Sequence, residues 1–110
     1  MPLMSMQIAH DLWTECGSTL EAALPEIRQM LCRELSVPME FCHLTLVPVY
    51  GLPDQAQASA DLRVLEKPER SLEQVRAAAL KLQDMLSAAA QVRVAVRVTM
   101  MDPARYFALR

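Results

Sequence analysis

The strongest constraint on the fold is a strict alternation of side chains between residues 92 and 100. Every second position carries an apolar side chain: Val92, Val94, Val96, Val98 and Met100. The positions between them hold polar or small residues: Arg93, Ala95, Arg97 and Thr99. Because successive side chains of a β-strand point to opposite faces, this pattern predicts a strand with one face packed in a core. Asp102 and Pro103 follow, and they should end the strand because proline has no N–H to donate.

Weaker forms of the same alternation predict three further strands, over residues 2–9, 41–49 and 60–66. Met4, Met6 and Ile8 share one face of the first strand. Pro48 should weaken pairing near the end of the second strand, since a proline cannot donate to a neighbouring strand. Residues 51–58 are expected to form the loop that joins the second strand to the third.

Two amphipathic stretches predict helices. The first should begin near Leu24 and Pro25, because proline suits the first turn of a helix, and should end before Pro38. A turn is expected around residues 16–18, with a short helical turn starting at Ser18. The second helix should begin at Ser71, which has the spacing of a capping box with Gln74, and continue to about residue 90.

The predicted order is therefore βαββαβ over a single domain of residues 1–110. This order predicts an α+β two-layer sandwich, in which two helices cover one face of a four-stranded sheet. The other face would be polar, and it is expected either to be solvated or to form a subunit interface. Its side chains would be Ser5, Gln7, His43, Thr45, Asp61, Arg63, Arg93 and Arg97.

Composition excludes several classes of protein. A chain of 110 residues builds one modest core, which such domains often complete by oligomerising. The net charge of −2 gives no basic field for nucleic acid, and no apolar run is long enough to span a membrane. The N-terminus lacks the pattern of a signal peptide. Cys16, Cys32 and Cys42 have no metal-ligand spacing with each other or with the two histidines, so we expect reduced thiols, a cytoplasmic location and no metal.

Pro2 is the most suggestive single residue, because the first predicted strand begins directly on it. Initiator methionine is normally removed before a small residue, so we expect a mature chain that begins with the secondary amine of Pro2. An α-amino group has a pKa of about 7.7–8.0, which desolvation lowers toward neutrality. Such a group suits proton transfer. Met-Pro also begins many proteins in which the proline has no chemical role, so both interpretations remain open from this residue alone.

Four segments, at spacings that run along nearly the whole chain, are similar to those of one family. They are the Met-Pro start of the first strand, residues 24–27 (Leu-Pro-Glu-Ile), residues 70–73 (Arg-Ser-Leu-Glu) and residues 101–104 (Met-Asp-Pro-Ala) with Phe107 beyond. The chain resembles the tautomerase superfamily and, within it, the 5-carboxymethyl-2-hydroxymuconate isomerases. Glu69 stands where the family has a glycine before the Arg-Ser pair.

The resemblance implies a homotrimer whose sheets form a central barrel, with active sites near subunit boundaries. It also implies an isomerase of aromatic-compound catabolism that needs no metal or cofactor. The substrate would be a small carboxylated enol or dienol, and Pro2 would shuttle its proton. Arg70 matches the family's arginine that contacts a substrate carboxylate. Its place beside a capped helix N-terminus independently favours an anion, although a solvated linker residue is the alternative.

The chain departs from the family pattern in its second strand. Residues 41–45 (Phe-Cys-His-Leu-Thr) contain no arginine where the family has an Arg-x-Arg pair. His43 is the replacement that can carry a positive charge there and bind substrate, and a structural role is the alternative. We expect Arg63, Arg93 and Arg97 to pair with Asp61 or with a neighbouring subunit.

Two other functions compete with the enzyme. One is a catalytically inactive trimer of the same fold with a structural or ligand-binding role. The other is a ferredoxin-like interaction or RNA-binding module, which the lack of aromatic stacking platforms and the net charge of −2 disfavour.

Overall fold

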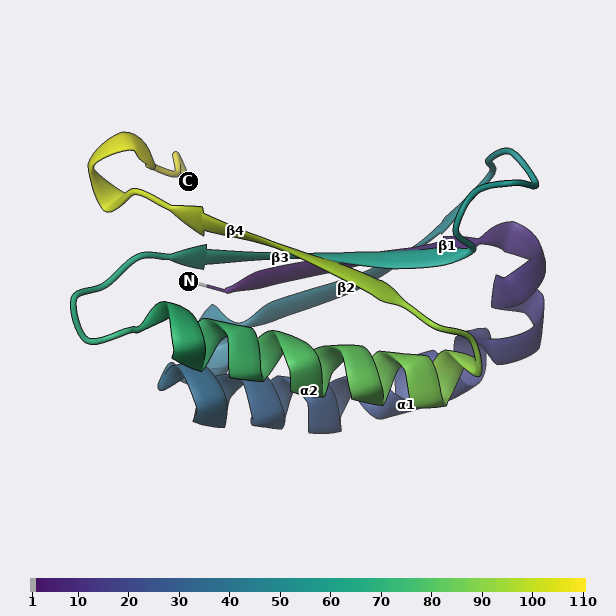
Figure 1. Ribbon diagram of the computed structural model, residues 1–110, viewed down its shortest axis with the longest axis horizontal. Coiled ribbons are helices and arrows are strands. Elements are labelled where there is room, and N and C mark those ends of the chain that lie inside the picture. The colour runs from purple at the N-terminus through teal and green to yellow at the C-terminus, as the bar shows by residue number, and fades with distance from the viewer. Residues whose placement is uncertain (1) are drawn as a thin grey trace.

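The computed structural model describes residues 2–110, and the predicted order of elements is confirmed. The strands are β1 (Leu3–Ala9), β2 (His43–Val49), β3 (Ala58–Leu65) and β4 (Ala95–Met101). The helices are α1 (His10–Leu35) and α2 (Leu72–Ala90). Two short 3-10 turns, Met39–Phe41 and Pro103–Arg105, precede β2 and follow β4. Both helices lie under one face of the sheet, as predicted (Figure 1).

The sheet has the strand order β2-β1-β3-β4, so β1 and β3 are central and β2 and β4 are edges. The central pair is antiparallel, with Leu3 opposite Arg63 and Ile8 opposite Ala58. Each edge strand runs parallel to its central neighbour and is connected to it through a helix. The chain therefore consists of two β-α-β units, β1-α1-β2 and β3-α2-β4, joined by one antiparallel contact. Because β1 and β3 are antiparallel, the start of β1 and the start of β3 lie at opposite ends of the sheet.

The core lies between the sheet and the helices. Alternate residues of the two central strands face the helices and are at most 1% exposed: Met4, Met6, Ile8, Ala58, Ala60, Leu62 and Val64. The helices contribute a matching set that includes Leu20, Ile27, Leu31, Leu35, Leu82 and Leu86. Full burial of one such large side chain stabilises the fold by roughly 1.5–3 kcal/mol.

The start of α1 was predicted wrongly. The helix begins at His10, directly after β1, and the turn and helical start expected around residues 16–18 lie inside it. The apolar stripe continues backwards through Leu12, Cys16 and Leu20, all of which are buried. Burial of that stripe outweighs the helix-breaking tendencies of Gly17 and Pro25, which had suggested a later start.

Pro25 is tolerated in the interior of α1 because it lies on the exposed side of the helix. A proline there removes one helical hydrogen bond and crowds the preceding turn, which bends the helix. Figure 1 shows this consequence, since the first part of α1 runs at a steep angle to the second part. The bend allows one long helix to follow the end of β1 and then cross beneath the sheet.

β4 and β2 begin later than predicted, because the backbone groups of the first residues predicted for them form hydrogen bonds outside the sheet. The N–H of Val94 donates to Ser87 Oγ at 3.0 Å, and its carbonyl accepts from Gln83 Nε2 at 3.0 Å. β4 therefore starts at Ala95, and Arg93 is not a strand residue of the open sheet face. The N–H of Phe41 donates to the Pro38 carbonyl at 3.1 Å, which closes a turn before β2.

Ser71 caps α2 as predicted, since its Oγ accepts the N–H of Gln74 at 3.0 Å. The three cysteines are free thiols and are buried. Burial, together with the neighbouring Cys32, raises the pKa of the Cys42 thiol to about 12. That thiol is therefore protonated at neutral pH and behaves as a small apolar core group.

Gly17 gives a test of the packing of α1. A Cβ at this position would lie 2.8 Å from two ring atoms of Trp13. In an ordinary helix interior, Gly→Ala stabilises by about 0.5–1 kcal/mol. Here we expect Gly17→Ala to lower the free energy of unfolding by about 1–3 kcal/mol, because the ring must move. Urea denaturation measures the change.

The matched control is Ser18→Ala, at the next and exposed position of the same helix. It should leave stability unchanged within about 0.5 kcal/mol or raise it slightly. A Gly17→Ala protein as stable as the unmodified protein would show that Trp13 does not require the glycine.

Candidate functional site

Pro2 immediately precedes the central strand β1 and is buried. Its carbonyl accepts the N–H of His43 at 3.2 Å, which joins the start of β1 to the start of β2. β1 is a central strand with a neighbouring strand on each side, so Pro2 lies at the end of a central strand of the sheet. Met1 lies outside the described residues, and its removal stays a prediction.

His43 is the first residue of β2 and is exposed. It is paired with Leu3 in the parallel register, so its side chain shares the open face of the sheet with Leu3. Pro2 instead continues the buried, even-numbered series of β1. The structure thus brings the backbones of Pro2 and His43 together, while the side chain of His43 points to the face away from the helices.

Arg70 is buried, with only 6% of its surface exposed. Its Nη1 donates to the carbonyl of Leu65 at 2.6 Å, and its Nη2 donates to the carbonyl of Leu35 at 3.0 Å. These carbonyls belong to the last residues of β3 and α1, while Arg70 itself precedes α2. One side chain therefore joins three elements, which we call the Arg70 clamp. Its burial excludes the alternative interpretation, in which Arg70 is a solvated linker residue.

The charge of Arg70 has no carboxylate partner within residues 2–110, where the one ion pair is Lys81 with Glu34 at 3.0 Å. Its Nε is buried and has no hydrogen-bond partner. Burial lowers the pKa of Arg70, against the opposing effect of Glu69, but an arginine stays protonated at neutral pH. A buried cation without a counter-ion makes its surroundings favourable for an anion.

The expected bidentate contact between Arg70 and a carboxylate stays a prediction. Both terminal nitrogens already face backbone carbonyls, so such a contact would have to replace or share those bonds. The sequence carried no signal for the clamp, because its acceptors are main-chain atoms that any residue type provides.

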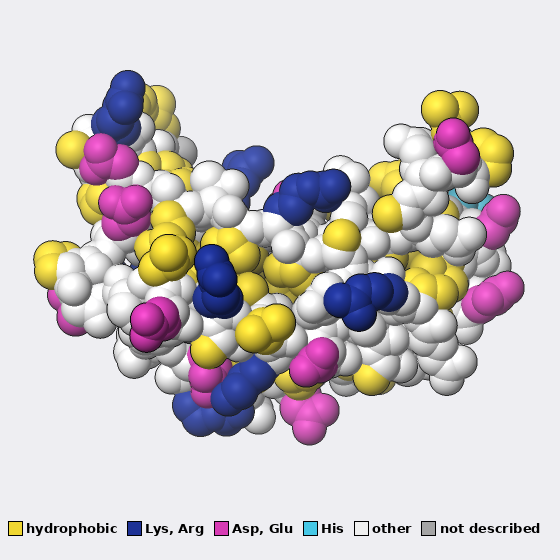
Figure 2. All heavy atoms as spheres, viewed as in Figure 1, with side chains coloured by type: hydrophobic (Ala, Val, Ile, Leu, Met, Phe, Trp, Pro, Cys, Tyr) yellow, Lys and Arg dark blue, Asp and Glu magenta, His cyan; other side chains and the backbone are white. Residues whose placement is uncertain are grey.

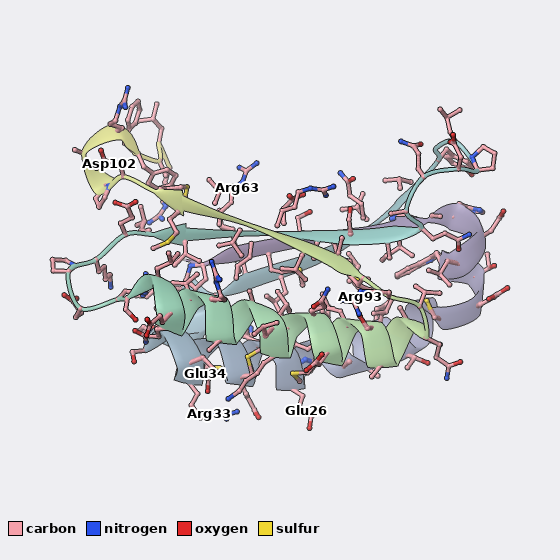
Figure 3. All side chains as sticks on the ribbon, in the orientation of Figure 1. Glu26, Arg33, Glu34, Arg63, Arg93 and Asp102 are labelled. Carbon is pink, nitrogen blue, oxygen red and sulfur yellow. The ribbon has the colours of Figure 1, made fainter. Side chains whose placement is uncertain are left out.

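The other arginines are placed separately. Arg63 lies on the open face and points away from the helices, whereas Arg93 lies outside β4 (Figure 3). Arg97 is opposite Asp61 in the register of β3 and β4. No ion pair joins Arg97 to Asp61 within the described subunit, so the first of the two pairings expected for these arginines is not formed.

Three cavities lie elsewhere on the subunit. One of about 350 Å³ lies between α2 and β4, and one of about 460 Å³ lies between the two helices. The third, of about 650 Å³, lies below the loop that joins β2 to β3. Within residues 2–110, no cluster of three or more histidine, cysteine, aspartate or glutamate residues could hold a metal ion. None of the helices in that range is long and apolar enough to cross a membrane.

No protein-family model matches this sequence, and no curated protein matches it. Solved structures do match along nearly the whole chain. A fused 4-OT, described as a wild-type symmetric trimer, has a TM-score of 0.71 at 16% identity, covering 96% of this chain and 90% of that one. The chain has the tautomerase fold.

Two further structures support this assignment. The macrophage migration inhibitory factor of Toxoplasma gondii matches with a TM-score of 0.65 at 12% identity, covering 97% of this chain and 94% of that one. A protein inactivated by 2-oxo-3-pentynoate matches with a TM-score of 0.70 at 16% identity, covering 96% of this chain and 90% of that one. The TM-scores and the coverage of these matches establish the tautomerase fold of this chain.

The Arg70 clamp predicts an unusually large effect on stability. Arg70→Met removes two donors from carbonyls at the ends of α1 and β3, and we expect a loss of about 2–4 kcal/mol in the free energy of unfolding. Arg70→Lys should be intermediate, because an ammonium group cannot reproduce the fork of the guanidinium. Chemical denaturation measures both changes.

Arg63→Met is the matched control, since Arg63 is exposed. It should change stability by no more than about 0.5 kcal/mol. Equal stabilities of the Arg70→Met and Arg63→Met proteins would contradict the clamp.

Proposed function

We propose that this protein is a cofactor-independent isomerase of the tautomerase type, and that its base is the free amine of Pro2 after removal of Met1. The observation that carries the proposal is the position of Pro2, buried at the start of the central strand and fixed by the bond from His43. An amine held in that way is partly desolvated, and desolvation favours its neutral, basic form. A base that is neutral near the working pH is the requirement for proton transfer.

The proposed reaction moves one proton. Neutral Pro2 removes a proton from an enol hydroxyl, or from the carbon next to a carbonyl, and becomes an ammonium group. The electron pair left behind is delocalised as an enolate or dienolate. Pro2 then returns the proton to a different carbon and recovers its neutral form. Positive groups around the site lower the energy of the anionic intermediate.

Arg70 and His43 are the residues proposed to bind the substrate carboxylate. Arg70 binds the carbonyl of Leu65, the last residue of β3, and β3 ends where β1 begins because the two are antiparallel. Its uncompensated charge therefore acts at the Pro2 end of the sheet, even with its terminal nitrogens bound to carbonyls. His43 lies beside Pro2 in the next strand.

The substrate class we propose is a small enol or dienol that carries a carboxylate, and the 5-carboxymethyl-2-hydroxymuconate type is the finer proposal. The inactivation of one protein of this fold by 2-oxo-3-pentynoate, itself a 2-oxo acid, supports a carboxylate next to the reacting group.

The free buried thiols fit the cytoplasmic location expected from the sequence, which stays a prediction.

The proposed assembly is a homotrimer in which a second copy completes the pocket around Pro2. Three observations support it: the edges of β2 and β4 are unpaired in the subunit, Pro2 lines none of the three cavities described above, and the fused 4-OT of this fold is a trimer. Light scattering should give three times the subunit mass of 12.3 kDa. A stable monomer at micromolar concentration would remove the trimer and the shared site together.

The catalytic proposal is tested with the enol–keto conversion of phenylenolpyruvate. Protein that begins at Pro2 should accelerate it, and the rate should fall as the pH drops through the pKa of the prolyl amine, because protonation removes the lone pair. Pro2→Ala leaves a primary amine and should keep only part of the activity. Intact mass identifies which N-terminus each sample carries.

The control is a form that retains Met1, made by adding a residue that blocks removal. Its proline nitrogen is an amide without a basic lone pair, so it should be inactive. Equal activity of the two forms would show that Pro2 is not the base, and the non-catalytic trimer would then be the better account.

His43→Gln should raise KM for carboxylated enols more than for uncharged enols if His43 contacts the carboxylate.

A further inference from the structure

The largest of the three cavities lies at the end of the sheet opposite Pro2. It has a volume of about 650 Å³, within the roughly 300–1,000 Å³ that is usual for small-molecule sites. Its floor is the open face of the sheet, where Gln7, Ser59 and Arg97 lie on neighbouring strands β1, β3 and β4. Its wall is the loop between β2 and β3. Figure 2 shows this loop rising at one end of the hollowed sheet face, with Lys and Arg side chains in the hollow.

The loop wall is braced by its own contacts. The ring of Tyr50 stacks on that of His10, with centroids 4.9 Å apart and planes 15° from parallel. Gln55 Oε1 accepts the N–H of Leu52 at 2.6 Å, and the N–H of Gln55 donates to the Leu52 carbonyl at 3.2 Å. Tyr50 and Leu52 line the cavity and are 86% and 69% exposed. The cavity therefore combines a preformed apolar wall with a polar floor.

Two charged side chains line this cavity, Arg97 and Asp11. Arg97 forms no ion pair in the described part of the chain, with Asp61 opposite it in the register or with Asp11. Its guanidinium can thus bind a carboxylate with two parallel hydrogen bonds. The amide of Gln7 and the hydroxyl of Ser59 are further donors on the same floor. Asp11, on α1, repels a second negative charge and favours a ligand with one carboxylate.

The two β-α-β units relate this cavity to the end of the sheet where Pro2 lies. β3 is the counterpart of β1 in the second β-α-β unit, and the cavity lies where β3 begins, between Gln57 and Ser59. Gln57 occupies the position before β3 that Pro2 occupies before β1. Its backbone nitrogen is a peptide amide in the middle of the chain and is not basic. A ligand held here would be bound without proton transfer.

We propose that this cavity is a second, non-catalytic site for a small monocarboxylate with a planar apolar body, with Arg97 binding the carboxylate and the wall of Tyr50 and Leu52 contacting the body. The site does not depend on Pro2 being a base, so it can be present in an enzyme or in an inactive protein. Its failure is therefore distinguishable from the failure of the proposed reaction.

The test uses benzoate as the probe and the full chain labelled with ¹⁵N. Amide chemical shifts of Gln7, Ser59 and Arg97 should change saturably with benzoate, and benzamide, which lacks the charge, should bind at least about tenfold more weakly. Arg97→Gln should weaken benzoate binding by a similar factor. Because Arg97 is exposed, this variant should fold normally, which its thermal melting temperature checks.

Arg63→Gln is the matched control, an exposed arginine on the same face of β3 that does not line the cavity. Its affinity for benzoate should stay within about twofold of the unmodified protein. The proposal is overturned if benzoate produces no saturable change at these amides, as when a second copy fills the cavity. It is equally overturned if the changes are confined to Pro2 and His43, if benzamide binds as well, or if Arg63→Gln weakens binding as much as Arg97→Gln.

Discussion

The side chain of Arg70 joins the ends of α1 and β3 to the start of α2, at the end of the sheet where β1 begins. Two hydrogen bonds to backbone carbonyls offset part of the cost of burying a charge, but they leave that charge without a counter-ion. The same interaction thus has a structural and an electrostatic consequence. It fixes the elements around Pro2, and it makes that end of the sheet favourable for an anion.

The two β-α-β units use one architecture to build two different ends of the sheet. At one end the strand follows Pro2, whose nitrogen becomes a free amine if Met1 is removed. At the other end the equivalent strand follows Gln57, whose nitrogen is always an amide. A cation lies near each end, Arg70 buried at the first and Arg97 exposed at the second. Proton transfer is therefore proposed at the first end and binding alone at the second.

The order of elements and the buried faces of the central strands β1 and β3 could be predicted because period-two alternation depends only on local sequence. The packed face predicted from the strict alternation of β4 was wrong for the subunit, since Val96 and Met100 are only half-buried and Val98 is 38% exposed, beside the cavity between α2 and β4. The start of α1 could not, since the burial of Leu12 and Leu20 against distant residues outweighs the local signals of Gly17 and Pro25. The later start of β4 depends on side chains of α2 that bind the backbone of Val94. The sequence likewise carried no signal for the Arg70 clamp, although it predicted Arg70 as a site residue. The resemblance predicted the tautomerase fold; the roles of Pro2, His43 and Arg70 stay predictions.

The most direct test of the central claim is the site at which 2-oxo-3-pentynoate modifies this protein. A neutral secondary amine adds to the alkyne of this reagent, so the peptide beginning at Pro2 should gain the mass of one reagent molecule. Activity should be lost at the same rate, and the form that retains Met1 should stay unmodified. The buried thiols of Cys16, Cys32 and Cys42 should not react. Modification at a cysteine, or loss of activity with an unmodified Pro2, would contradict the account.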